Sequence, residues 1–127
     1  MTLTKLKAHT NAILTGDVKL PDNTVYIPLL MQALEEIANR VDCLALITKS
    51  SDARVLRVIA DGLYIRKPKE PRLDTDKIDI DEELMYAVSN FIASYISQVR
   101  PQHFEAIAEG IMLSYELKIL ETETEEC

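Results

Sequence analysis

The chain has 127 residues, of which 47% are hydrophobic and 28% charged, and it carries a formal net charge of −7. These values predict a single domain (1–127) with a modest core, and the lack of a long apolar run or a signal-peptide core leads us to expect an intracellular chain without a membrane span. The net negative charge disfavours wrapping of nucleic acid, because phosphate binding requires clustered cations.

A first helix is predicted over residues 2–15. Its leucines and isoleucines recur near helical spacing, with alanines between them. Thr2 or Thr4 can cap its start, and Gly16 fits the position just past its end. The segment that follows is polar and rich in turn residues, so it is predicted to be a link between two helices.

A second helix is predicted over residues 24–41. Asp22, Asn23 or Thr24 can cap it, and Pro28 should be tolerated only in its first turn. Its apolar residues recur at i, i+3, i+4 and i+7, which predicts a helix that buries one face. These residues are Leu30, Ala33, Leu34, Ile37, Ala38 and Val41.

The middle of the chain is predicted to hold a small β-hairpin over residues 54–67. Its first strand contains β-branched residues, and Ala60-Asp61-Gly62 has the composition of a tight turn. A further turn is expected at 50–53, whereas 44–50 fits either a strand or a continuation of the second helix. Cys43 lies in an apolar run and is expected to be a buried thiol with no disulfide partner, as in a reducing compartment.

A third helix is predicted over residues 79–99, after a polar linker at 68–78. Asp79 with Glu82 three residues later resembles a capping box, and the acidic residues suit the positive end of the helix dipole. Pro101 predicts that the helix ends at Arg100. The apolar stripe consists of Leu84, Val88, Phe91, Ile92, Tyr95, Ile96 and Val99.

A fourth helix is predicted over residues 102–121, followed by a disordered acidic tail at 122–127. The short connection predicts that the third and fourth helices are antiparallel neighbours. Their shared core is expected to contain Phe91, Ile92, Tyr95, Phe104, Ile107 and Ile111. Apolar residues cover so much of the fourth helix that we expect it to be buried on more than one side, for which a contact between subunits is one explanation. The stripe Phe104, Ile107, Ala108, Ile111 and Tyr115 is widened by Met112, Leu113, Leu117 and Leu120.

The predicted fold class is therefore mainly α (α+β), a bundle of about four helices with a small inserted hairpin. No pattern of a catalytic site or cofactor site is present, so we expect no enzymatic activity, no cofactor and no metal. His9 and His103 are expected to be surface or capping residues. The alternating aspartates of 74–81 leave a weak divalent-ion site open, although they lack the glycine of a calcium-binding loop.

The charges are distributed unevenly along the chain. Residues 54–72 hold six cationic and two acidic residues, whereas 73–127 hold three cationic and thirteen acidic ones. The cationic stretch fits three roles: a solvated hairpin edge, a contact with the acidic face of a neighbouring subunit, or a contact with phosphate. We expect that a single subunit does not satisfy both charge clusters. The candidate intersubunit contacts are Arg54, Arg57, Arg66, Lys67, Lys69, Arg72, Asp79, Asp81, Glu82 and Glu83.

Residues 62–99 resemble the small head-to-tail connector proteins of tailed bacteriophages. Those proteins often carry an aromatic-Ile-Arg-x-Pro strand end, matched here by Tyr64-Ile65-Arg66-Lys67-Pro68. An acidic helix opening and a helix rich in Ala, Ile and Tyr follow, matched by Asp79-Ile80-Asp81-Glu82-Glu83-Leu84 and AVSNFIASYIS. The resemblance implies a structural protein of the virion, assembled in the host cytoplasm, with no catalytic residues.

The resemblance also implies the partners. Such connectors form homo-oligomeric rings, commonly of twelve subunits, between the portal protein and a downstream tail or stopper protein. The ring surrounds phage DNA during genome packaging and ejection without binding a specific sequence, and it does not contact a membrane. The alternative is a small cytosolic helical interaction or regulatory module, which the charge and the lack of a site fit equally well. An enzyme using acidic pairs and a divalent ion fits least.

Overall fold

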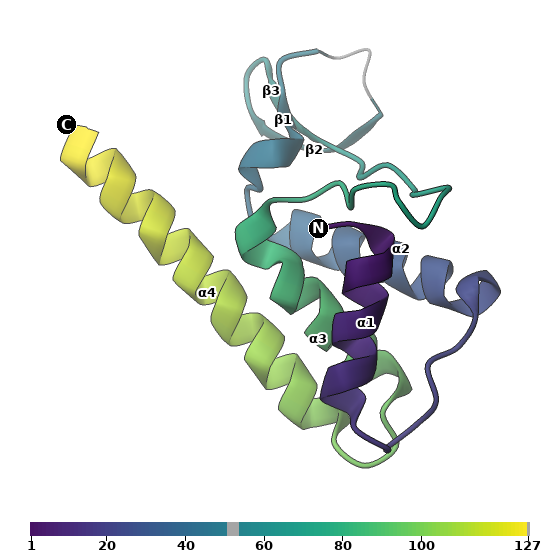
Figure 1. The fold of residues 1–127 in the computed structure, drawn as a ribbon. Helices are drawn as coiled ribbons and strands as arrows, with labels where there is room; N and C mark the ends of the chain where they lie inside the picture. Colours follow the sequence, from purple (N-terminus) through teal and green to yellow (C-terminus); the bar gives the residue numbers. More distant parts are fainter. Residues whose placement is uncertain (51–53, 127) are drawn as a thin grey trace.

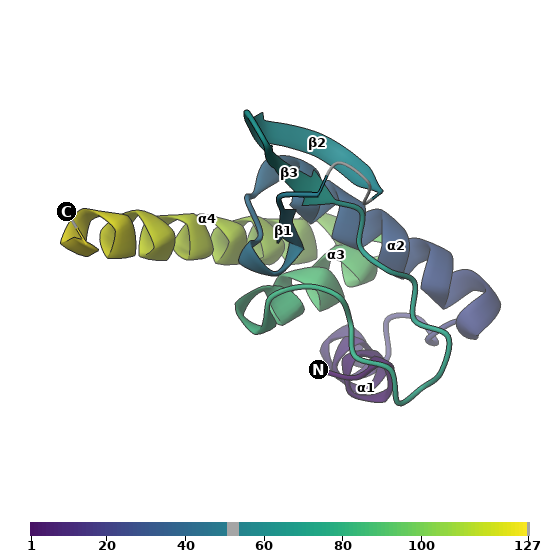
Figure 2. The same ribbon diagram turned by 90° about the horizontal axis from the view of Figure 1, so that it is seen from above.

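The computed structural model describes residues 1–50 and 54–126 (Figure 1). Within them, four α-helices and a small three-stranded antiparallel sheet confirm the predicted mainly helical fold with an inserted hairpin. The helices α1, α2 and α4 pack around α3, and the sheet lies at one end of this bundle (Figures 1 and 2).

Helix α1 spans Leu3–Leu14 and begins where the sequence predicts. The Thr2 side chain caps it by accepting a hydrogen bond from the backbone N–H of Lys5 at 3.3 Å. The chain leaves the helix through two residues with positive φ, Thr15 and Gly16 (φ +79°), and a glycine suits this left-handed conformation best.

Helix α2 spans Asn23–Arg40, and Asp22 caps it by accepting a hydrogen bond from the Thr24 N–H at 3.0 Å. The predicted apolar stripe is buried throughout. Pro28 lies within the helix rather than in its first turn, so that part of the prediction is wrong. Its side chain is exposed, so the carbonyl left without an N–H partner lies on a face that water reaches.

The sheet contains β1 (Ile47–Thr48), β2 (Val55–Ala60) and β3 (Leu63–Arg66) in the order β1-β3-β2. Strands β2 and β3 form the predicted hairpin, and Gly62 in its turn has φ +72°. The ambiguous segment 44–50 is mixed, because a 3₁₀ helix over Leu44–Leu46 leads into β1. The turn expected at 50–53 falls largely on residues 51–53, outside the described residues.

Helix α3 spans Met85–Ile96 and follows a 3₁₀ turn at Glu82–Leu84, so the predicted start at residue 79 is wrong. Ile78 and Ile80 are both buried, and the segment around them runs along the body before the helix begins. Asp79 does not cap α3, because its carboxylate binds Arg66 and the backbone N–H of Lys69 instead.

The end of α3 also differs from the prediction, at Ile96 instead of Arg100. Asp17, at the end of α1, accepts hydrogen bonds from the Ser97 hydroxyl and from the Gln98 N–H, the latter at 3.2 Å. The Arg100 N–H donates to the Ser97 hydroxyl at 2.9 Å. These bonds stabilise a non-helical connection and turn the chain towards α4.

Helix α4 spans Pro101–Glu126 and lies antiparallel to α3, as predicted (Figure 1). The expected disordered tail is wrong for 122–126, which continue the helix; residue 127 lies outside the described residues. No glycine or proline follows Gly110, and most of the later residues have good helix propensity, so no local signal ends the helix.

The core confirms three of the six residues expected between α3 and α4. Phe91, Ile92 and Phe104 are at most 2% exposed, although Phe104 belongs to a smaller cluster with Leu14. Ile107 is 39% exposed, because it lies at the open edge of the helix pair, so its predicted burial is wrong. Tyr95 and Ile111 are only partly buried, and Val99, expected in the α3 stripe, lies exposed in the connection between the two helices.

Candidate interaction surfaces

The Arg66–Asp79 pair shows that part of the predicted contact set is satisfied within one subunit. An Arg66 guanidinium nitrogen lies 2.8 Å from Asp79 Oδ1 and 3.2 Å from the Ala45 carbonyl oxygen. The Lys69 N–H donates to Asp79 Oδ2 at 2.8 Å. The two charged side chains are only 23% and 19% exposed, so this pair joins the hairpin to the segment before α3.

The environment of Asp79 favours its ionised form. Burial acts to raise the pKa of this carboxyl, but the hydrogen bonds from Arg66 and Lys69 outweigh burial and hold the pKa below its ordinary value. The Arg66 pKa is raised, mainly by its hydrogen bond to Asp79. Both shifts indicate an ion pair that belongs to the subunit's own fold.

Arg57 and Asp81 are also bound internally. Arg57 donates to Asp42 at 2.6 Å and to the Ala38 carbonyl at 2.9 Å, which ties β2 to the end of α2. Asp81 accepts from the Ala45 N–H at 2.8 Å and from the Tyr115 hydroxyl of α4. The expectation that one subunit cannot satisfy these charges is therefore wrong for Arg57, Arg66, Asp79 and Asp81.

The other two acidic candidates, Glu82 and Glu83, are more exposed. Glu82 contacts the N-terminal amine of Met1, and Glu83 lies 4.0 Å from Lys118 of α4. Their side chains are 70% and 55% exposed, so these contacts leave both carboxylates in reach of solvent. An intersubunit role for them stays a prediction.

The remaining cationic candidates line one concave site, which we call the cationic pocket. Its volume is about 520 Å³, and it combines four cationic side chains with two acidic ones. Among the described residues, none of the four cationic side chains forms an ion pair. The pocket is lined by Met31, Glu35, Arg54, Lys67, Pro68, Lys69, Glu70 and Arg72.

The local fold explains why these cations remain unpaired. Asp76 accepts hydrogen bonds from the Arg72 and Leu73 N–H groups, both at 2.9 Å, and Asp79 accepts from the Lys69 N–H. The nearby carboxylates therefore bind the backbone of this segment rather than its side chains. These hydrogen bonds fix the backbone of the segment, and the side chains of Lys67, Lys69 and Arg72 are exposed to solvent.

The second surface is the outer face of α4, made by Ala106, Gly110, Leu113 and Leu117 and including Ile107 at its edge towards α3. Leu113 is 57% exposed, Leu117 52% and Ile107 39%, so three large apolar side chains of this face contact water. The opposite side of α4 packs on the body through residues such as Phe104 and Ala108. The helix is thus apolar on two sides, as the sequence indicates, but a single subunit buries only one of them.

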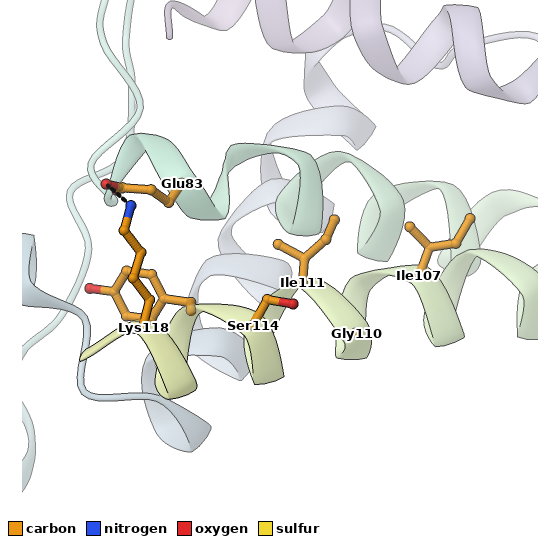
Figure 3. Close-up of a pocket in the computed structure, with 7 residues that line it drawn as sticks. Glu83, Ile107, Gly110, Ile111, Ser114 and Lys118 are labelled. Carbon is orange, nitrogen blue, oxygen red and sulfur yellow. Dashed lines mark ion pairs between the residues drawn. The ribbon is translucent and has the colours of Figure 1, made fainter. Parts of the chain in front are cut away.

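A shallow apolar groove of about 470 Å³ runs along this part of α4. Figure 3 shows Ile107 and Ile111 projecting from α4 towards α3, with Gly110 and Ser114 leaving the groove open. The ion pair between Glu83 and Lys118 crosses one end of the groove (Figure 3). The groove can therefore accept apolar side chains from outside the subunit.

The structure places His9 and the aspartates of 74–81 in contacts within the subunit. His9 is half-buried rather than at the surface, and its Nδ1 lies 2.7 Å from the Ser89 hydroxyl, a pairing that sequence spacing does not indicate. Ser89 also donates to the Tyr86 carbonyl at 3.0 Å, and within 1–50 and 54–126 no carboxylate hydrogen-bonds to His9. No group of three or more His, Cys, Asp or Glu in the described chain is placed to hold a metal, since the aspartates of 74–81 each contact a different group.

Cys43 is the buried thiol that the sequence predicts. Its side chain is fully buried, and burial raises the pKa of the thiol to about 12. The thiol is therefore protonated and unreactive at neutral pH.

Comparison with known protein families, with curated protein sequences and with solved structures finds no match for this chain. None of the described helices is long and apolar enough to cross a membrane.

Proposed function

We propose that this chain is a structural virion protein, a subunit of the ring that joins the portal to the tail of a tailed bacteriophage. The proposal begins with the resemblance of residues 62–99 to such connectors. The observation that carries it further is the outer face of α4, which leaves Ile107, Leu113 and Leu117 in water when the subunit is alone. Fully burying one such side chain contributes about 1.5–3 kcal/mol, so covering this face favours assembly.

The shape of the subunit supports a contact with another copy. Helix α4 has 26 residues, which corresponds to a length of about 39 Å. Its C-terminal turns extend beyond the other helices (Figures 1 and 2). A projecting element that contacts a different surface of the next copy gives a head-to-tail arrangement, and such an arrangement closes into a ring when the rotation between copies fits.

The charge of the chain is compatible with a passage for DNA. A net charge of −7 repels phosphate overall, so DNA inside such a ring would move without being held. The internal pairing of Arg57 and Arg66 removes two cations from the set that phosphate contact would need.

The deciding experiment measures the mass of the assembly. The chain is produced alone and together with a portal protein encoded in the same genome, and each sample is analysed by light scattering and electron microscopy. A ring of many copies bound to the portal supports the connector. A fixed small dimer that ignores the portal supports the alternative, a cytosolic interaction or regulatory module, because the outer face of α4 could also pair two copies.

A charged side chain on the outer face of α4 should block assembly. We expect Leu113→Glu with Leu117→Glu to abolish rings on the portal, because each glutamate would have to be buried without a partner. The monomer should keep its helical content and melting temperature, since both side chains are more than half exposed. Val25→Glu, at a 50% exposed position on α2, is the matched control and should assemble normally. Rings that form despite both glutamates would contradict this role of α4.

Gly110→Ala separates subunit stability from assembly. A Cβ added at Gly110 would meet no atom within 4 Å, so alanine should raise the free energy of unfolding by about 1 kcal/mol through its higher helix propensity. We expect the same change to weaken ring formation, because a neighbour packed on the outer face would approach the helix closely at this residue. Denaturant unfolding and ring yield are the two measurements, with Ser114→Ala as control. An unchanged yield of rings would show that no neighbour packs closely at Gly110.

A further inference from the structure

The cationic pocket and the C-terminal turns of α4 lie on opposite sides of the subunit. In both views the end of α4 is far from the loop that follows β3, which carries most of the pocket (Figures 1 and 2). The two parts therefore cannot meet within one copy. They are accessible to two different neighbours.

The last turns of α4 have a strongly negative character. The sequence places glutamates at 121, 123, 125 and 126, and no basic residue lies in the last turn of the helix. The free carbonyl groups at a helix C-terminus add partial negative charge in the same place. The sequence of 121–126 therefore carries four negative side chains and no positive one.

We propose that the cationic pocket of one copy binds the acidic C-terminal turns of α4 from the next copy. This inference rests on the proposed ring and names the surfaces that form its contact. Four cationic side chains of the pocket meet four glutamates of the helix end. Because the pocket and the helix end lie at opposite sides of each copy, the contact repeats head to tail, and the assembly closes into a ring when the rotation between copies fits.

The pocket suits an acidic helix of the same chain better than a nucleic acid. Glu35 and Glu70 lie in its wall and divide its positive charge, whereas a continuous phosphate backbone is bound by clustered cations. Met31 and Pro68 give the pocket apolar surface, which can cover the backbone and methyl groups of a helix end. The chain itself supplies the complementary charge at a position that every copy presents.

Zero-length cross-linking between isotopically labelled copies tests the contact directly. Unlabelled and ¹⁵N-labelled full chains are mixed at low salt and treated with a carbodiimide, which joins a lysine amine to a carboxylate only when the two are in contact. We expect peptides that link Lys67 or Lys69 of one copy to residues 121–126 of the other. Links that occur only within one copy, or mixed links that avoid the pocket, would overturn the proposal.

Reversing the charges on both surfaces tests whether these residues act in the contact between copies and not only in the fold of one subunit. The variant Lys67→Glu, Lys69→Glu, Arg72→Glu should bind other copies at least about tenfold more weakly, as should the variant with lysines in place of the glutamates at 121, 123 and 125. A chain that carries both sets of changes should associate again. The association is measured by sedimentation, with circular dichroism as the check of folding. The control variant of equal charge change, which should associate normally, is Lys5→Glu, Lys19→Glu, Lys49→Glu.

The outcomes distinguish this inference from the proposed function. Rings on the portal that tolerate reversal of the pocket leave the connector in place and overturn the pocket contact. Open chains that depend on the pocket, with no ring and no portal binding, support the contact and reject the connector. Binding of a DNA oligonucleotide that is lost on pocket reversal, without any change in self-association, would assign the pocket to phosphate and overturn the proposal.

Discussion

Phe91→Ala should lower the free energy of unfolding by about 3–5 kcal/mol. Phe91 is 1% exposed and lies on α3, the helix that all the other helices contact. Its ring stacks near Tyr95 with a centroid separation of 6.4 Å. Removing the ring leaves a cavity that the surrounding helices cannot fill without moving apart. Urea unfolding, followed by circular dichroism at neutral pH, measures the loss.

Leu113→Ala is the matched control for this measurement. It also removes a large apolar side chain, but from a position that is 57% exposed, so the unfolding free energy should change by less than about 0.5 kcal/mol. A loss under about 1 kcal/mol for Phe91→Ala would place α3 in a different orientation from the one described. A loss of equal size at both positions would show that oligomers, not monomers, are being unfolded.

The helices whose boundaries the sequence predicts well are those with local signals. Thr2 caps α1 and Asp22 caps α2, as expected, and the i, i+3, i+4 stripe of α2 is buried throughout. Capping and amphipathic spacing depend on residues a few positions apart, so they can be recognised in a sequence. For the same reason the hairpin turn at Gly62 is predictable.

The boundaries of α3 are mispredicted because distant residues decide them. Asp79 has the position of a capping residue, but Arg66 of β3 binds its carboxylate before the helix begins. Asp17, from the end of α1, holds Ser97 and Gln98 in a non-helical connection at the other end. Neither contact leaves a pattern in the local sequence. The tertiary partner outweighs the helical preference in both cases.

In the candidate site, too, the local sequence predicts some features and distant contacts decide the others. The sequence identifies the cationic residues of 54–72 as a group, but it does not indicate which of them the fold neutralises. Arg57 and Arg66 form ion pairs with aspartates of the same subunit, whereas Lys67, Lys69 and Arg72, around the cationic pocket, form no ion pair with any residue that the structure describes. Only the arrangement of β3 and the loop after it separates the two sets.

Asp79→Asn should lower the free energy of unfolding by about 2–3 kcal/mol at pH 7. The carboxylate accepts hydrogen bonds from Arg66 and from the Lys69 N–H, and asparagine offers one acceptor in place of two charged oxygens. The charge of Arg66, only 23% exposed, would lose its counter-ion. Breaking a fully buried pair costs about 3–5 kcal/mol, and the partial exposure of this pair reduces that figure. Urea unfolding of both proteins measures the difference.

The pH dependence gives this prediction a definite sign. The Asp79 pKa is lowered in the folded protein, so the unfolded chain takes up a proton more readily than the folded one. The stabilising contribution is therefore complete above the ordinary carboxyl pKa of about 3.9 and is lost as the pH falls through the lowered folded-state value. The stability difference between the natural chain and Asp79→Asn should be constant near neutral pH and should shrink below about pH 4.

The comparison with Asp79→Asn is needed because other carboxyls titrate in the same range. The pKa values of Asp17, Asp22 and Asp76 are also lowered, by hydrogen bonds that each accepts, so the natural chain loses stability in acid for several reasons. Those contributions are common to both proteins and cancel in the difference. Glu116→Gln, at an exposed position on α4, should change the free energy of unfolding at pH 7 by less than about 0.5 kcal/mol. If Asp79→Asn behaves in the same way, Arg66 does not depend on Asp79, and the pair would be free to contact a neighbouring subunit after all.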